Sequence, residues 1–139
     1  GLIVADHIGL MRGTGNENSV EEIVAGNSQG LHELAKELKI PIIVLVQLNR
    51  DVEKRGKNGR PMMSDLRSSG SLEQDADTIM FVWNPDAAAQ GETQTGIVEW
   101  IIGKNRSGPL GKVIVKFIAA CTRFEEFREG EYPQERDND

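Results

Sequence analysis

Few residues of this 139-residue chain can form a disulfide or bind a metal through sulfur or imidazole. Cys121 is the single cysteine, so no disulfide can form within the chain, and we expect this residue to be a small part of the core. The only histidines are His7 and His32, and together with Cys121 they give no spacing typical of a zinc site. Folds stabilised by disulfides or by structural zinc are therefore excluded.

Long apolar runs are missing as well. No stretch is long enough to cross a bilayer, and the first residues lack the pattern of a secretory signal. We therefore expect a cytoplasmic protein with no membrane partner. A composition of 38% hydrophobic and 27% charged residues is that of one globular domain or of part of one.

The sequence also lacks the glycine-rich loop that holds the nucleotide phosphates in many ATPases. That loop reads Gly, four residues, Gly-Lys and then Ser or Thr. Three Gly-Lys pairs occur, but the position of the first glycine is taken by Asp51, Val98 or Arg106. If the chain belongs to such an ATPase, we expect the phosphate-binding half to precede Gly1.

Charge is distributed unevenly along the chain. The net charge is −6, and the residues from 125 to 139 account for −5 of it. Residues 50–67 carry six basic and three acidic side chains, and the stretch 104–116 carries four basic side chains and no acidic one. An anionic ligand is therefore expected at the two basic stretches rather than at the acidic end.

The spacing of apolar residues predicts an α/β fold with parallel strands, helices and a C-terminal antiparallel hairpin. One long helix is expected where apolar residues recur on one face, and Gly26 and Gly30 weaken its middle. The last two long strands are joined by too few residues for a parallel crossover, so they should form a hairpin. The expected order is strand Leu2–Ala5, helix Ser19–Lys39, strand Ile42–Val46, a basic loop to Pro61, short helix Ser64–Gln74, strand Thr78–Trp83, a surface loop Pro85–Thr95, strands Gly96–Ile102 and Lys112–Ala119, and a last strand within Thr122–Phe127.

Two polar side chains are expected at one edge of the parallel strands. Asp6 follows the first strand and Gln47 follows the second. Parallel strands bring their carboxyl ends to the edge where open α/β folds bind ligands. A carboxylate there can act on the magnesium of a bound nucleotide, and an amide can contact a phosphate. Each residue can equally be a solvated turn residue, so the pattern alone leaves both interpretations open.

Four segments resemble the RecA-like motor domain of the DnaB-type replicative DNA helicases. They are Asp6 after the first strand, Gln47-Leu48-Asn49-Arg50, the block from Arg60 to Asp77, and the segment from Lys104 to Pro109. The resemblance runs from Leu2 to about Phe127, and the middle block is very specific. It implies a partial RecA-like P-loop NTPase core in residues 1–127 that lacks the phosphate-loop half. Residues 128–139 are then an acidic, disordered tail.

The resemblance implies a nucleotide site shared between subunits. Asp6 matches the Walker B aspartate, which acts on Mg²⁺ generally through water, and Gln47 matches a sensor of the ATP γ-phosphate or of the attacking water. Arg50 would position the loop that follows. Lys104 and Arg106, which alternation places on one side of the hairpin tip, match the bases that reach the neighbouring protomer's phosphates, with Arg106 as the arginine finger. The active enzyme is therefore expected to be a homo-hexameric ring.

The resemblance also assigns DNA contacts. Arg67, Ser68, Ser69 and Gly70 match the loop that tracks the phosphates of single-stranded DNA, and Arg123 matches a position near the nucleotide base. The sequence departs from the family at Ser68, where glutamate is common, and at His7 and Gly9, where an aromatic residue and a glutamine are common.

The carboxylates of the middle block are interpreted as structural rather than as a metal cluster: Asp65, Glu73, Asp75 and Asp77.

The implied function is that of a hexameric helicase that couples ATP hydrolysis to translocation on single-stranded DNA and to unwinding of the duplex during replication. Its cofactors would be ATP and Mg²⁺, and its partners primase and a helicase loader. The isolated segment is expected to be inactive because the phosphate loop is missing. Two alternatives remain: another RecA-like ATPase, such as a recombinase or repair paralogue, and a non-enzymatic module for single-strand binding or oligomerisation.

Overall fold

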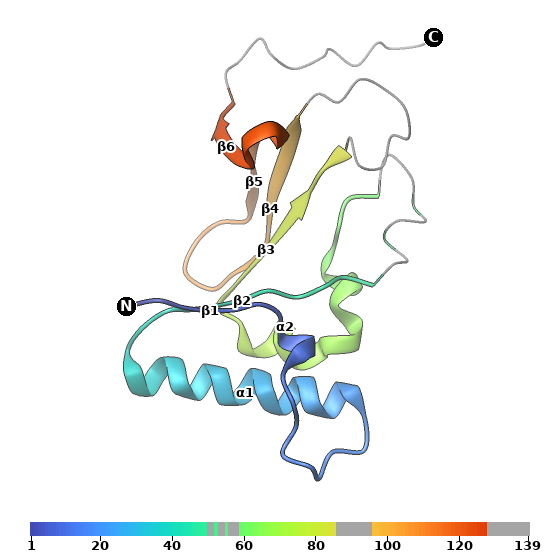
Figure 1. Cartoon of the computed structure of the whole chain (residues 1–139), viewed down its shortest axis with the longest axis vertical. Coiled ribbons are helices and arrows are strands. Elements are labelled where there is room, and N and C mark those ends of the chain that lie inside the picture. Colours follow the sequence, from blue (N-terminus) through green and yellow to red (C-terminus); the bar gives the residue numbers. More distant parts are fainter. Residues whose placement is uncertain (50–51, 53–54, 56–58, 86–95, 128–139) are drawn as a thin grey trace.

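The computed structural model describes residues 1–49, 52, 55, 59–85 and 96–127. Within them, a long helix lies beneath a small parallel sheet, and a larger antiparallel sheet extends away from both (Figure 1). The elements are β1 (Ile3–Ala5), η1 (Ile8–Leu10), α1 (Val20–Leu38), β2 (Ile42–Val44), η3 (Met63–Ser69), α2 (Gly70–Asp75), β3 (Thr78–Trp83), β4 (Ile97–Asn105), β5 (Gly111–Ile118), η4 (Ala119–Cys121) and β6 (Arg123–Glu126).

The predicted long helix forms as one continuous element despite its two glycines. Ser19 is the N-cap and accepts a hydrogen bond from the Glu22 backbone N–H at 3.1 Å. Lys39 ends the helix in the left-handed conformation, with φ of 54°. The helix connects β1 to β2, which pair in parallel with Val4 opposite Ile43. The expected strand–helix–strand unit is thereby confirmed, with both strands shorter than predicted.

The core lies between this unit and α2. Ile8, Val24 and Leu72 form a buried apolar cluster, against which Val44 and Leu31 pack. Because Leu72 comes from α2 and Val24 from α1, the cluster joins segments that are distant in sequence. Burial of such apolar side chains is the main favourable contribution to folding.

The antiparallel sheet has the order β3-β4-β5-β6, in which chain neighbours are also neighbours in space. The strand predicted at Thr78–Trp83 has those bounds, and the predicted hairpin is the β4–β5 pair. β4 continues to Asn105, three residues beyond its predicted end, because it pairs with the start of β3. The two sheets share no strand pair among the described residues.

The predicted short helix is a 3₁₀ segment, η3, followed by α2. It begins one residue before Ser64, with Met62 as the N-cap residue. The cap is made by Asp65, whose carboxylate accepts the Met62 backbone N–H at 2.8 Å. Ser64, the first residue of the predicted helix, is thus not the N-cap, although serine is common at that position. No helix of the described chain is long and apolar enough to cross a membrane.

The prediction that Cys121 belongs to the core is wrong. This thiol is exposed because it ends η4, the short turn that connects β5 to β6 at the margin of the sheet. The acidic tail from 128 to 139 lies outside the described residues. Most of the predicted loop at Pro85–Thr95 and much of the basic loop, including Arg50, lie outside them as well.

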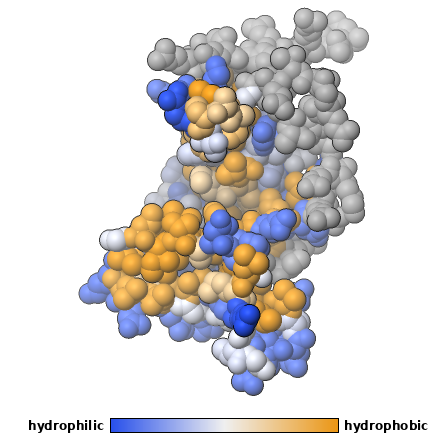
Figure 2. Space-filling model, in the orientation of Figure 1, coloured by the Kyte–Doolittle hydropathy of each residue, from blue (hydrophilic) through white to orange (hydrophobic). Residues whose placement is uncertain are grey.

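One face of the parallel strands is apolar and uncovered. Burial alternates along β1 and β2, so that Val44 on one face packs against the core cluster and the side chains on the other face are about half exposed. Figure 2 shows a hydrophobic area at the left of the lower half, where Figure 1 places these strands. The exposed side chains of this outer face are Leu2, Val4, Ile43 and Leu45.

The glycines of α1 give a prediction about stability. A Cβ added at Gly26 or Gly30 would meet no atom within 4 Å. Because alanine is favoured over glycine inside a helix, Gly30→Ala should raise the free energy of unfolding by about 1 kcal/mol. Urea denaturation measures the change. Gly13→Ala is the contrasting variant, since its Cβ would clash with a Glu17 carboxylate oxygen, and it should not stabilise the protein. A less stable Gly30→Ala variant would contradict the prediction.

Candidate functional site

Asp6 and Gln47 leave the parallel sheet at the same edge. Asp6 directly follows β1, and Gln47 follows β2 by three residues. Backbone bonds continue the pairing past the strands: the Leu45 N–H donates to the Ala5 carbonyl at 2.9 Å, and the Ile8 N–H donates to the Leu45 carbonyl at 3.1 Å. Both polar side chains are exposed. The structure therefore places both residues at the edge of the parallel sheet where they were expected.

Asp6 supplies one exposed carboxylate at this edge, but the described residues do not form a complete metal site. No group of three His, Cys, Asp or Glu side chains in the described part of the chain could hold a metal ion. Magnesium bound to a nucleotide usually keeps several waters and takes one or two carboxylates together with the phosphates. The segment can supply one such carboxylate, and its sequence contains no phosphate loop.

Lys104 and Arg106 contact the C-terminal end of α2. The Lys104 Nζ donates to the carbonyl oxygens of Glu73 at 2.6 Å and Gln74 at 3.2 Å. The Arg106 guanidinium donates to the Gln74 carbonyl at 2.6 Å and to the Asp77 carboxylate at 2.8 Å. A helix leaves its last carbonyls without partners of its own, and cations are favoured there. Both basic side chains therefore lie on one side of the hairpin, as alternation predicts.

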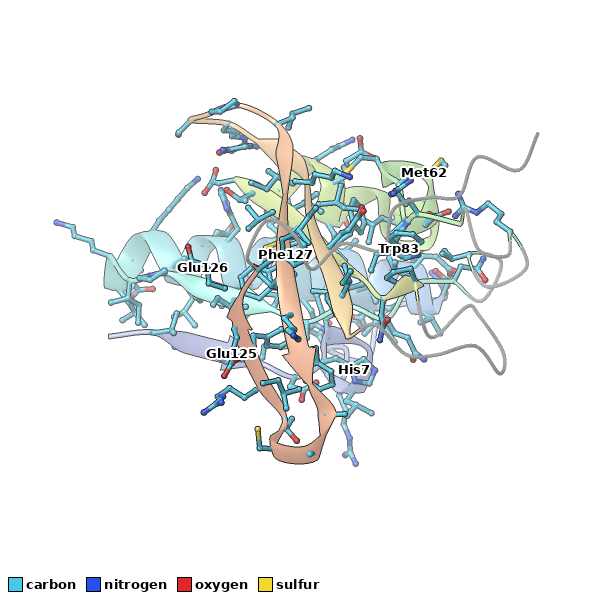
Figure 3. The ribbon with its side chains drawn as sticks, turned by 90° about the horizontal axis from the view of Figure 1, so that it is seen from above. His7, Met62, Trp83, Glu125, Glu126 and Phe127 are labelled. Carbon is cyan, nitrogen blue, oxygen red and sulfur yellow. The ribbon has the colours of Figure 1, made fainter. Side chains whose placement is uncertain are left out.

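These two bases do not lie near Asp6. Figure 3 shows the turn between β4 and β5 at one end of the view and His7, the residue next to Asp6, toward the other end. Within one chain, the structure thus keeps the candidate phosphate-contacting bases away from the candidate magnesium aspartate.

The candidate DNA-contacting residues form the junction between two helical segments. Arg67, Ser68 and Ser69 end η3, and Gly70 begins α2. The side chains of residues 67–69 lie outside the described part of the chain. Gly70 is exposed, and a Cβ there would meet nothing within 4 Å, so its backbone is accessible to a ligand.

A buried carboxylate that the sequence prediction missed lies in the middle of β4. Glu99 is fully buried and accepts two hydrogen bonds from Arg60, at 2.8 and 3.0 Å, and one from Lys112 at 3.2 Å. The hydrogen bonds from Arg60 hold the pKa of Glu99 below its ordinary value, against the effect of burial, and Lys112 adds to them. The signal was a glutamate inside the apolar run from Ile97 to Ile102.

Arg60 fixes the end of the basic stretch to the antiparallel sheet. Besides its ion pair with Glu99, its guanidinium carbon lies 4.6 Å from the centroid of the Trp83 ring. The chain that leaves Arg60 leads directly into η3 and then to Gly70. Glu99 is therefore a structural anchor for the segment that contains the candidate DNA contacts.

The acidic residues of the middle block have structural partners. Asp65 caps η3 and forms an ion pair with Arg55 at 2.5 Å. Asp75 accepts a hydrogen bond at 2.6 Å from the buried Ser28 hydroxyl of α1. Asp77 pairs with Arg106, so these three carboxylates behave as predicted. Arg123 forms an ion pair with Glu125 on its own strand, β6.

Comparison with known proteins identifies one family across almost the whole chain. Residues 1–126 match the family described as DnaB-like helicase C terminal domain. The chain is 43% identical over 128 residues to the replicative DNA helicase DnaB of Haemophilus influenzae, covering 92% of this chain and 27% of that protein. It is 44% identical over 126 residues to the protein of the same name from Geobacillus stearothermophilus, covering 89% of this chain and 27% of that protein. The chain thus spans about a quarter of the length of these relatives.

Solved structures agree with the sequence comparison. A structure described as an ATPase domain matches with a TM-score of 0.84 at 38% identity, covering 91% of this chain and 44% of that one. A structure described as a DnaB-like replicative helicase and its interactions with primase gives the same TM-score and identity. It covers 91% of this chain and 30% of that one. The predicted RecA-like fold class is confirmed by these neighbours.

The buried Glu99 predicts a dependence of stability on pH. Because its pKa is lower in the folded than in the unfolded chain, its contribution to stability is complete above the unfolded pKa and is lost as the pH falls through the folded pKa. Glu99→Gln should cost about 1–3 kcal/mol near neutral pH, since Arg60 and Lys112 lose a charged acceptor. The loss relative to wild type should shrink as the pH is lowered.

Urea denaturation at several pH values tests this prediction. Glu126→Gln, which removes an exposed carboxylate from β6, is the control and should stay within about 0.5 kcal/mol of wild type. A Glu99→Gln variant whose deficit is independent of pH would contradict the assignment of the effect to this carboxylate.

Proposed function

Because the chain belongs to the family of DnaB-like helicase C-terminal domains, we propose that it is the C-terminal part of the ATPase motor of a hexameric replicative DNA helicase. The motor couples ATP hydrolysis to translocation on single-stranded DNA and to unwinding of the duplex at the replication fork. The half that contains the phosphate loop precedes Gly1 in the natural polypeptide. This division is supported by how little of its relatives the chain covers. It covers 27% of each named DnaB protein and 44% of the solved ATPase domain.

The observation that carries the proposal is the separation of Lys104 and Arg106 from Asp6. A base that stabilises the charge of a transferring phosphoryl group must lie at the phosphates. The turn that follows those bases lies away from His7, the neighbour of Asp6 (Figure 3), so each nucleotide would lie at a subunit boundary. Arg106 then acts on the ATP that a neighbouring protomer holds, and a closed ring gives every site such a neighbour.

The nucleotide roles follow from the edge at which β1 and β2 end. Asp6 would hold Mg²⁺ through water, and Gln47 would contact the γ-phosphate or orient the attacking water. Bound Mg²⁺ would neutralise charge that develops on the phosphates. Arg123 would lie near the nucleotide base. The exposure of Asp6 and Gln47 at one edge supports these two assignments.

The DNA roles belong to the junction of η3 and α2. Arg67, Ser68, Ser69 and the backbone at Gly70 contact the phosphates of one strand and read no bases. The accessible backbone of Gly70 supports this proposal. Primase and a loader are the proposed protein partners. Primase is supported by the solved structure described with it, whereas the loader rests on the family resemblance alone.

A test of the shared site uses the full-length protein with Asp6→Asn or Arg106→Ala. Each variant alone should lose its ATPase activity. Rings co-assembled from equal amounts of both should regain about a quarter of the wild-type activity, because about one boundary in four joins an intact Asp6 to an intact Arg106. ATP turnover in the presence of single-stranded DNA measures the recovery. Arg12→Ala, which removes an exposed arginine, is the control for charge.

Two outcomes would count against the shared site. An Arg106→Ala ring with wild-type turnover would show that this arginine does not act on the phosphates. Mixed rings that stay inactive, although they assemble as hexamers, would show that Asp6 and Arg106 do not serve the same nucleotide.

The isolated 139-residue chain should show no ATPase activity above background, because it contains no phosphate loop. Turnover by the pure chain, abolished by Asp6→Asn, would contradict this prediction. Tight, salt-dependent binding of single-stranded DNA by the chain without nucleotide would instead favour a binding module. The DNA sequence upstream of the codon for Gly1 distinguishes the helicase motor from the binding module, since the motor requires a Gly-x-x-x-x-Gly-Lys-Ser/Thr segment there.

A further inference from the structure

The end of α2 forms a cradle for the two basic residues at the tip of β4. Lys104 donates to two carbonyl oxygens of the last helical turn, and Arg106 donates to one of them and to the Asp77 carboxylate. The Arg106 backbone N–H also donates to the Asp77 carbonyl at 2.9 Å. Asp77 therefore holds Arg106 twice, once through its backbone and once through its side chain.

The cradle leaves both bases able to contact a further ligand. A guanidinium has five N–H donors and an ammonium has three, so two acceptors each leave donors free. The Arg106 side chain is 48% exposed, so its remaining donors are accessible to solvent. Arg106 can thus keep its contact with Asp77 while it donates to a phosphate from outside the chain.

The cradle itself is fixed to the body of the protein. Leu72 places α2 in the core cluster, and Asp75 accepts the hydrogen bond from the buried Ser28 of α1. α2 has six residues, a length of about 9 Å, and it begins at Gly70, the last of the candidate DNA contacts. One short rigid element therefore has the candidate DNA-contacting junction at one end and the two bases at the other.

We propose that Asp77, together with the C-terminal carbonyls of α2, is a positioning group for Arg106 and Lys104. It orients these bases toward the phosphates of the neighbouring protomer's nucleotide. Because α2 connects Gly70 to the end that holds the bases, a changed position of the bases should also change the stimulation of turnover by single-stranded DNA bound at the junction. This inference rests on the proposed function, because it needs Arg106 to act across the subunit boundary.

A purely stabilising role for Asp77 is the competing explanation. The Asp77 side chain is 71% exposed, and exposed ion pairs contribute little to stability. The stabilising role predicts a small change in melting temperature and no specific change in turnover. The positioning role predicts a loss of turnover with no change in melting temperature.

The test compares Asp77→Ala with Asp77→Asn in the full-length helicase. Asp77→Ala should lower the kcat for ATP roughly tenfold, with KM within about twofold of wild type, because misplacement of a catalytic group affects the chemical step. The stimulation of turnover by single-stranded DNA should fall as well. Asp77→Asn keeps an oxygen that can accept from Arg106 and should recover most of the loss. Neither variant should change the melting temperature or the hexamer.

Glu37→Ala, which removes an exposed carboxylate from α1, is the matched control and should behave as wild type. Unchanged kcat and DNA stimulation in Asp77→Ala, while Arg106→Ala is inactive, would overturn the positioning role and leave the proposed function intact. A full-activity Arg106→Ala enzyme would instead refute the proposed function. Parallel losses of kcat and melting temperature in both Asp77 variants would assign Asp77 a structural role and would also overturn the inference.

Discussion

The packing of α2 against α1 is the interaction on which the arrangement of the whole segment depends. The two sheets share no strand pair among the described residues, so strand pairing does not set the position of one sheet relative to the other. Leu72 in the core cluster and the Ser28–Asp75 hydrogen bond connect the β1–α1–β2 unit to the chain that continues into the antiparallel sheet. This contact therefore helps to set the position of the candidate DNA-contacting junction relative to the edge that contains Asp6 and Gln47.

The elements with strong periodicity were predictable from the sequence, and the polar contacts between them were not. The long helix and the strand at Thr78–Trp83 follow from local pattern, because apolar spacing specifies them directly. Cys121 was misplaced because residue type says nothing about a position at the margin of a sheet. Serine is common at helix N-caps, but the cap of η3 is made by Asp65 from inside the first turn and not by the neighbouring Ser64.

The candidate site was likewise predictable only in part. Asp6 and Gln47 could be placed at one edge because parallel strands must end there. The burial of Glu99 and the contact of Arg106 with Asp77 could not be predicted, since both depend on which segments meet after folding. A single glutamate among apolar residues indicates a buried charge, but the sequence does not say that the partners lie 39 residues before it and 13 residues after it.

The order of the elements along the chain has a consequence for biosynthesis. β3 to β6 are adjacent both in sequence and in space, and sheets with such local contacts fold faster than sheets assembled from distant segments. The core cluster, in contrast, is complete only after Leu72 has been translated. A nascent β1–α1–β2 unit on the ribosome therefore exposes the apolar outer face together with the side of α1 that α2 later covers. Transiently exposed apolar surface of this kind is what chaperones bind during synthesis.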